Sequence, residues 1–169
     1  CVCSNRIIVQ AGIYDEFVSK LTAATQSLVI GNGTEEGVTV GPLIDEKAAN
    51  NVCDFIDDAL AKGAKVALGG GRSDLGGSFV LPTILTDVSR DMRVFSEEIF
   101  GPVAPVFKFE TEAEVVEMAN DTEFGLAAYF YSRDIGRVWR VAEQLEYGIV
   151  GVNEGVVSNE MAPFGGVKE

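Results

Sequence analysis

The sequence contains no histidine, and only three of its 169 residues are cysteines. Without an imidazole, the chain cannot by itself form a Ser-His-Asp triad, a Cys-His dyad or a histidine metal site. Cys1, Cys3 and Cys53 are also too few for the disulfide framework of a secreted protein, so we expect a reducing, cytoplasmic location. Two neighbouring thiols and a distant one are one ligand short of a structural zinc site, and we expect no metal.

Positive charge is scarce as well. The 13 Lys and Arg residues face 26 Asp and Glu residues, which gives a formal charge of −13. Such a chain repels phosphate, so nucleic acid and anionic membranes are poor candidate partners. No apolar run approaches the ~20 residues of a membrane helix. We therefore expect no membrane partner, and we expect residues 1–169 to form a single domain.

What the sequence does contain is an alternation of strand and helix patterns. Short apolar runs predict strands, and stripes of apolar residues three or four positions apart predict helices. The predicted strands are 6–10, 64–70, 79–88, 103–109, 127–132 and 148–153. The predicted helices are 13–30, 46–62, 111–119 and 134–145. This order indicates an α/β fold, a parallel or mixed sheet flanked by helices.

Several details of these elements are also predicted. Pro82 should confine its strand to an edge or an irregular path, and Gly63 should end the second helix. The stretch "TEAE" (111–114) is a capping box, and the apolar "GIVGVN" (148–153) suits a strand buried on both faces. The expected helix stripes are Ile13, Phe17, Leu21, Ala24 and Leu28; Val52, Ile56, Ala59 and Leu60; and Ile135, Val138, Trp139, Ala142 and Leu145.

Two glycine-rich stretches are most simply plain turns. In "GNGTEEG" (31–37) the last gap is one residue too long for a dinucleotide fingerprint, and the stretch follows a helix instead of a strand. "GGGR" (69–72) lacks the Lys and Ser or Thr of a phosphate-binding loop. We therefore expect the dinucleotide-binding domain to be absent from this chain.

Three further stretches carry a resemblance to a known family. "CVCSNR" (1–6), "EEIFGPV" (97–103) and "NEGVVSNEMAPFGGVK" (153–168) follow the order and rough spacing of the catalytic part of aldehyde dehydrogenases. The resemblance covers all 169 residues and is strongest to succinate-semialdehyde dehydrogenases. It implies that the chain starts at the active-site loop and is truncated at both ends.

The resemblance also implies roles for individual residues. Cys1 stands five residues before Arg6, as the family's nucleophile stands before its Arg, and would attack the aldehyde to form a thiohemiacetal and then a thioester. Glu98 would accept hydrogen bonds from the nicotinamide ribose, with Phe100 packing beside the ring, whereas Glu97 is interpreted as structural. Two further residues would line the substrate pocket: Phe164 as an apolar wall and Ser158 as a hydrogen-bond partner of the distal carboxylate.

The cofactor implied is NAD or NADP, bound mainly by the missing domain, and the partner is a small-molecule aldehyde. A homo-oligomer of the full-length protein is also implied. Three alternatives stay open: a dehydrogenase of another aldehyde, a thiol redox module, and a structural module without activity of its own. Cys3 is either a small packing residue or half of a reversible switch with Cys1.

Overall fold

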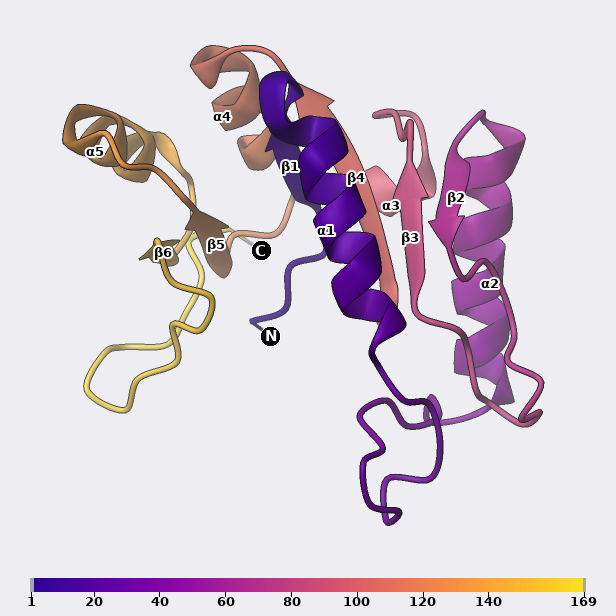
Figure 1. The fold of residues 1–169 in the computed structure, drawn as a ribbon. Helices are drawn as coiled ribbons and strands as arrows, with labels where there is room; N and C mark the ends of the chain where they lie inside the picture. Colours follow the sequence, from indigo (N-terminus) through magenta and orange to yellow (C-terminus); the bar gives the residue numbers. More distant parts are fainter. Residues whose placement is uncertain (1, 169) are drawn as a thin grey trace. The chain divides into compact units, whose positions relative to one another are not determined.

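The computed structural model describes residues 2–168, which form two compact units (Figure 1). Residues 5–109 make up the larger unit, and residues 2–4 and 110–168 make up the smaller unit. The prediction of a single domain over residues 1–169 stays a prediction. Both units combine strands with helices, which confirms the α/β class.

The larger unit contains four strands and three α-helices. Its strands are β1 (Ile7–Gln10), β2 (Lys65–Leu68), β3 (Thr83–Thr86) and β4 (Val103–Phe109). Its helices are α1 (Tyr14–Gln26), preceded by a 3-10 turn η1 (Ala11–Ile13), α2 (Glu46–Ala61) and the short α3 (Arg93–Ser96). The smaller unit contains α4 (Glu112–Asn120), β5 (Ala127–Phe130), α5 (Ile135–Gln144) and β6 (Ile149–Val152).

The strands of the larger unit form one mixed sheet in the order β1-β4-β3-β2. β4 is parallel to both β1 and β3, whereas β2 is antiparallel to β3. Of the two alternatives predicted from Pro82, the edge position is wrong, because β3 lies between two partners. Its pairing with β2 is irregular, with a register shift between Val66 and Leu68. Pro82 directly precedes Thr83, the first residue of the strand, so its missing N–H group falls outside the strand.

Helix α1 packs on one face of this sheet. Tyr14 lies in a cluster with Val9, Ile84 and Val106, and its hydroxyl donates a hydrogen bond to the Val106 carbonyl at 2.8 Å. The helix is shorter than the predicted range 13–30. Ile13 and Leu28 fall outside it and are 55% and 41% exposed, so only the middle of the predicted stripe packs on the sheet.

Helices α2 and α3 pack against the opposite face. Phe107 follows Val106 in β4 and therefore points to the other side of the sheet, where its ring meets Phe95 of α3 edge-on at 5.4 Å. In α2, Val52, Ile56 and Ala59 are buried as predicted, together with Phe55; Leu60 is 39% exposed, which corrects its predicted inward position. Gly63 adopts a positive φ of 102° just after the helix, which confirms the predicted stop.

The smaller unit is built on the parallel pair β5 and β6. In β6 only Gly151 is buried, and the other three residues are partly exposed. Within the described residues 2–168, the prediction that this strand is buried on both faces is therefore wrong. Helix α4 begins with the predicted capping box between Thr111 and Glu114. The predicted stripe of α5 is largely open, with Ile135 71% and Trp139 65% exposed.

Within residues 2–168, no helix has the length and apolar character needed to cross a membrane. The same residues hold no group of three or more metal-ligating side chains of the His, Cys, Asp or Glu type.

Helices α4 and α5 are joined by one carboxylate. Glu112 accepts hydrogen bonds from Arg137 Nε at 2.9 Å and from Arg140 Nε and Nη2 at 2.9 and 3.0 Å. The hydrogen bonds from Arg140 and then Arg137 lower the pKa of Glu112 from 4.5 to about 2. A carboxyl group whose pKa is lower in the folded state stabilises the fold above its unfolded pKa.

We therefore expect the contribution of Glu112 to stability to be present at neutral pH and to fade as the pH falls from 4.5 toward 2. Glu112→Gln should flatten the dependence of the unfolding free energy on pH in this window. Urea unfolding can be followed through Trp139, the single tryptophan, which lies on α5. Glu143→Gln is the matched control, because it removes an exposed carboxylate of α5. Equal flattening in both variants would contradict the prediction.

Candidate active site

The predicted site residues fall in both units. Glu98 and Phe100 belong to the larger unit, and Cys3, Ser158 and Phe164 belong to the smaller unit. Cys1, the predicted nucleophile, lies outside the described residues.

Glu98 and Phe100 lie in the irregular segment 97–102 between α3 and β4. Both side chains are exposed, Phe100 to 80%, whereas the intervening Ile99 is only 2% exposed and anchors the segment in the core. Phe100 also has a positive φ of 52°. An aromatic residue adopts this conformation only where its surroundings impose it, and such strain is concentrated at functional sites. The segment therefore presents a carboxylate and an aromatic ring outward from a fixed backbone.

The side chain of Asn5 forms hydrogen bonds with the backbone on both sides of Glu98. The Asn5 Nδ2 donates a hydrogen bond to the Glu97 carbonyl at 3.0 Å, and its Oδ1 accepts one from the Ile99 N–H, also at 3.0 Å. Sequence reasoning missed Asn5, because nothing local relates a residue before β1 to a segment more than ninety positions away. The only signal in the sequence was the residue type, because a side-chain amide both donates and accepts hydrogen bonds.

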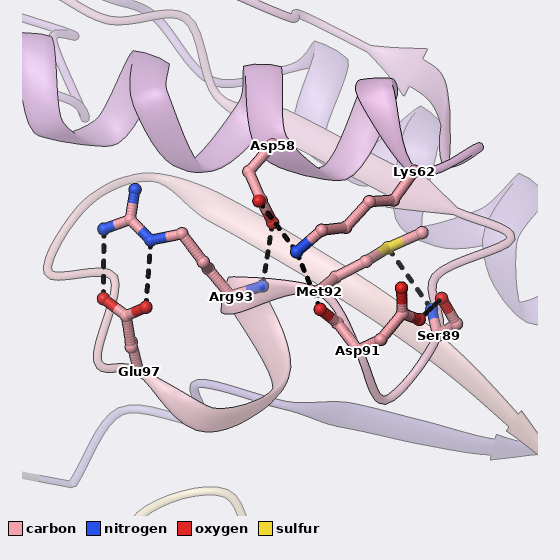
Figure 2. A network of polar contacts seen from close by, with 7 residues as sticks. All are labelled: Asp58, Lys62, Ser89, Asp91, Met92, Arg93 and Glu97. Carbon is pink, nitrogen blue, oxygen red and sulfur yellow. Dashed lines mark hydrogen bonds and ion pairs between the residues drawn. The ribbon is translucent and has the colours of Figure 1, made fainter.

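Upstream of this segment, α3 is tied to the C-terminal end of α2 (Figure 2). Asp58 Oδ2 accepts a hydrogen bond from the Arg93 N–H at 2.9 Å, and Asp58 Oδ1 lies 2.8 Å from Lys62 Nζ. Lys62 also donates to the Asp91 carbonyl at 2.7 Å. The hydrogen bonds from Lys62 and then Arg93 lower the pKa of Asp58, so this carboxylate stays charged and holds the start of α3.

The two adjacent glutamates of the segment differ in their surroundings. Glu97 makes a two-point ion pair with Arg93, at 2.9 and 3.0 Å, which lowers the pKa of Glu97 (Figure 2). The Arg93 guanidinium also lies 4.2 Å from the centre of the Phe55 ring. Glu98, in contrast, makes no hydrogen bond or ion pair with any of residues 2–168. Glu97 is thus part of the scaffold, and the Glu98 carboxylate is available to a ligand.

In the smaller unit, Tyr129 connects the start of the chain with β6. Its hydroxyl donates to the Val2 carbonyl at 2.8 Å, between the two cysteines of "CVCSNR". Its ring lies against Gly151: a Cβ there would meet Tyr129 Cδ1 at 2.8 Å and Val157 Cγ1 at 2.6 Å. Burial is the main cause that raises the pKa of Tyr129, with a smaller effect of the nearby Cys3 charge. Sequence reasoning identified a strand here but not this tyrosine.

The predicted substrate residues lie on the loop that follows β6. Ser158 comes directly after Val157 and is exposed, and Phe164 is 51% exposed. The backbone after Phe164 is held closely, because a Cβ on Gly148 would lie 1.8 Å from the Gly165 carbonyl oxygen. Lys168 strengthens this end of the loop through its ion pair with Glu146 at 2.8 Å. Both side chains are thus exposed on a loop that is anchored at each end.

The chemistry available is that of thiols, a carboxylate and aromatic rings. Cys3 is exposed and carries a free thiol, and Cys53 is partly buried. A shallow cavity of about 370 Å³ lies between α1 and the β2–β3 pair, but its walls include Tyr14, Asp15 and Asp87 and none of the predicted site residues. This cavity is therefore not the predicted site.

The sequence is similar to proteins of known family. The sequence matches the aldehyde dehydrogenase family over residues 1–169. It is 63% identical over 169 residues to a 3-sulfolactaldehyde dehydrogenase of Pseudomonas putida, covering 100% of this chain and 35% of that protein. It is 60% identical over 168 residues to the NADP(+) succinate-semialdehyde dehydrogenase GabD of Escherichia coli, covering 99% of this chain and 35% of that protein.

The fold is similar to solved structures as well. A crystal structure of a succinate-semialdehyde dehydrogenase from Burkholderia pseudomallei has a TM-score of 0.98 and 61% sequence identity. The match covers 99% of this chain and 35% of that chain. The chain thus spans about a third of the length of the relatives it matches.

Proposed function

The chain belongs to the aldehyde dehydrogenase family, and on this premise we propose that it is the thiol-bearing catalytic part of an NAD(P)-dependent dehydrogenase that oxidises succinate semialdehyde to succinate. The observation that carries this proposal is the identity of 60% or more, over nearly the whole chain, to enzymes named for small acidic aldehydes. We expect the whole enzyme to be a cytoplasmic homo-oligomer.

In the proposed reaction Cys1 is the nucleophile. Its thiolate adds to the aldehyde carbonyl to form a thiohemiacetal on Cys1, and a nicotinamide, when bound, would supply the acceptor for the hydride that this carbon gives up. Water then hydrolyses the Cys1 thioester and releases the acid. This chain contains no histidine, and we place the base that activates Cys1 or the water in the rest of the enzyme.

The residues present fit a dinucleotide. The exposed Glu98 carboxylate has the acceptor capacity to bind two ribose hydroxyl groups, and it makes no hydrogen bond or ion pair within residues 2–168 that would compete. Phe100 provides an exposed aromatic ring in the same segment, whose backbone Asn5 holds. The role of Glu98 is to orient the ribose, which fixes the distance and angle of hydride transfer.

Ser158 and Phe164 are proposed to contact the aldehyde. The names of the two relatives reported above share one feature, an aldehyde that also carries an acidic group, a sulfonate in the first and a carboxylate in the second. A serine hydroxyl can donate a hydrogen bond to either anion. We therefore assign Ser158 to the distal acidic group of the substrate and Phe164 to its apolar stem.

The role of Cys1 is tested in the whole enzyme. Cys1→Ser should abolish aldehyde-dependent formation of NAD(P)H and of a covalent acyl-enzyme, whereas Cys53→Ser, in the larger unit, should form both. The 169-residue chain alone should be inactive, because it lacks the base and the dinucleotide-binding domain, and such groups commonly contribute ~10²-fold or more each. Dehydrogenase activity that survives Cys1→Ser would exclude this mechanism, whereas a whole protein without any aldehyde-dependent activity would favour the thiol-module or structural alternatives.

The role of Ser158 is tested with two substrates of the whole enzyme. Ser158→Ala should raise KM for succinate semialdehyde about tenfold or more, because a hydrogen bond to a charged group contributes ~1.5–3 kcal/mol. The KM for a simple alkyl aldehyde should change less than about twofold, within the range of ordinary surface substitutions. Ser19→Ala, at an exposed position of α1, is the control. An equal loss for both substrates would indicate a dehydrogenase of another aldehyde.

Cys3 is proposed to protect Cys1 by a reversible disulfide. Its exposure favours this role over packing in the core. Mild peroxide should inactivate the whole enzyme and a thiol reductant should restore it, whereas Cys3→Ser should drift to irreversible over-oxidation of Cys1. Activity and the mass of the Cys1 peptide distinguish the two outcomes. Full rescue of Cys3→Ser by reductant would leave Cys3 without a switch function.

A further inference from the structure

We propose that Asn5 is a positioning residue for the dinucleotide, which acts by holding the backbone on both sides of Glu98. This inference rests on the proposed function, because it assigns to Asn5 the orientation of the carboxylate that binds the ribose. Its basis is the pair of hydrogen bonds, each 3.0 Å long, that one amide makes to the Glu97 carbonyl and to the Ile99 N–H.

Of the three residues Glu97, Glu98 and Ile99, Glu98 is the one whose side chain is free to move. The side chain of Glu97 is fixed by Arg93, and the side chain of Ile99 is buried at 2% exposure. With both flanking backbones also held by Asn5, the direction of the Glu98 Cα–Cβ bond is set, and only its side-chain torsions are left to adjust to a ligand. A carboxylate restricted in this way loses less conformational entropy when it binds.

Asn5 is itself well anchored. It directly precedes Arg6, whose guanidinium lies 5.0 Å from the centre of the Phe95 ring, and β1 begins immediately afterwards. In sequence it also follows Cys1 by only four residues. The segment that contains the proposed nucleophile thus also supplies the side chain that holds the proposed ribose ligand.

The Ile99 N–H shows why a smaller side chain cannot replace Asn5. Ile99 is buried, and an unpaired buried N–H is costly, so the segment would rearrange to satisfy it elsewhere. Rearrangement at Ile99 would change the direction of Glu98 and of Phe100, whose positive φ already depends on its neighbours. The expected consequence is weaker dinucleotide binding with little effect on capture of the aldehyde.

The experiment measures binding as well as catalysis in the whole enzyme. Asn5→Ala should raise the dissociation constant of NAD(P)H, measured by calorimetry or nicotinamide fluorescence without aldehyde, by up to about tenfold, because a Glu98 side chain that is no longer held in place must be ordered when it binds. The KM of the aldehyde should change less than twofold. Asn5→Asp keeps the acceptor for the Ile99 N–H and loses the donor to Glu97, so it should be intermediate, and it provides the test if Asn5→Ala does not fold.

Asn120 offers a matched control. Its Nδ2 donates to the Gln144 carbonyl at 2.8 Å and its Oδ1 accepts from the Glu146 N–H at 2.9 Å, which is the same pair of hydrogen bonds around a single residue in the smaller unit. Asn120→Ala therefore removes equivalent bonds, and should lower the melting temperature without a selective effect on NAD(P)H. A similar rise in the NAD(P)H dissociation constant in both variants would reduce Asn5 to a general structural role and overturn the proposal.

A double-mutant cycle separates this inference from the proposed function. If Asn5 acts through Glu98, Asn5→Ala should raise the dissociation constant less than twofold in a Glu98→Gln background, whereas independent effects would multiply. Multiplying effects would overturn the proposal and leave the role of Glu98 intact. A Glu98→Gln variant that binds NAD(P)H like the wild type would instead reject the ribose role of Glu98, and with it any action of Asn5 through that residue.

Discussion

The larger unit depends on the position of β4 in the interior of its sheet. This strand pairs in parallel with β1 on one edge and β3 on the other, and its adjacent residues Val106 and Phe107 are buried on opposite faces. Tyr14 adds a hydrogen bond to the Val106 carbonyl from α1. Because β4 is fixed on two edges and two faces, the segment that leads into it is also fixed at its C-terminal end.

That segment carries the two exposed residues of the candidate cofactor site. At its N-terminal end it is held by α3, which the Asp58 and Lys62 contacts tie to α2 (Figure 2). Between these ends Ile99 is buried and Asn5 binds the backbone, so Glu98 and Phe100 face outward from a fixed backbone. Rigid elements place functional groups more accurately than free loops do, and here a six-residue stretch gains that accuracy from its neighbours.

The smaller unit also holds its predicted site residues on an anchored segment, but with fewer buried residues. Its sheet has only two strands, which by themselves are marginal in water. Helices α4 and α5 are joined through the Glu112 carboxylate, and the loop after β6 is held by the close approach of Gly165 to Gly148. Polar contacts and close backbone approaches therefore replace much of the core that a larger sheet would provide.

The sequence by itself determined the order of the elements other than η1 and α3, the capping box at Thr111, the stop at Gly63 and the motifs that indicate the family. These are local features, set by periodicity, by side chains within one turn of a helix, or by short patterns. Only the tertiary structure decided that β3 lies inside its sheet despite Pro82, that α5 leaves Trp139 exposed, and that Asn5 and Tyr129 hold the predicted site segments. Each of these depends on contacts between residues far apart in sequence, for which local patterns carry no physical signal.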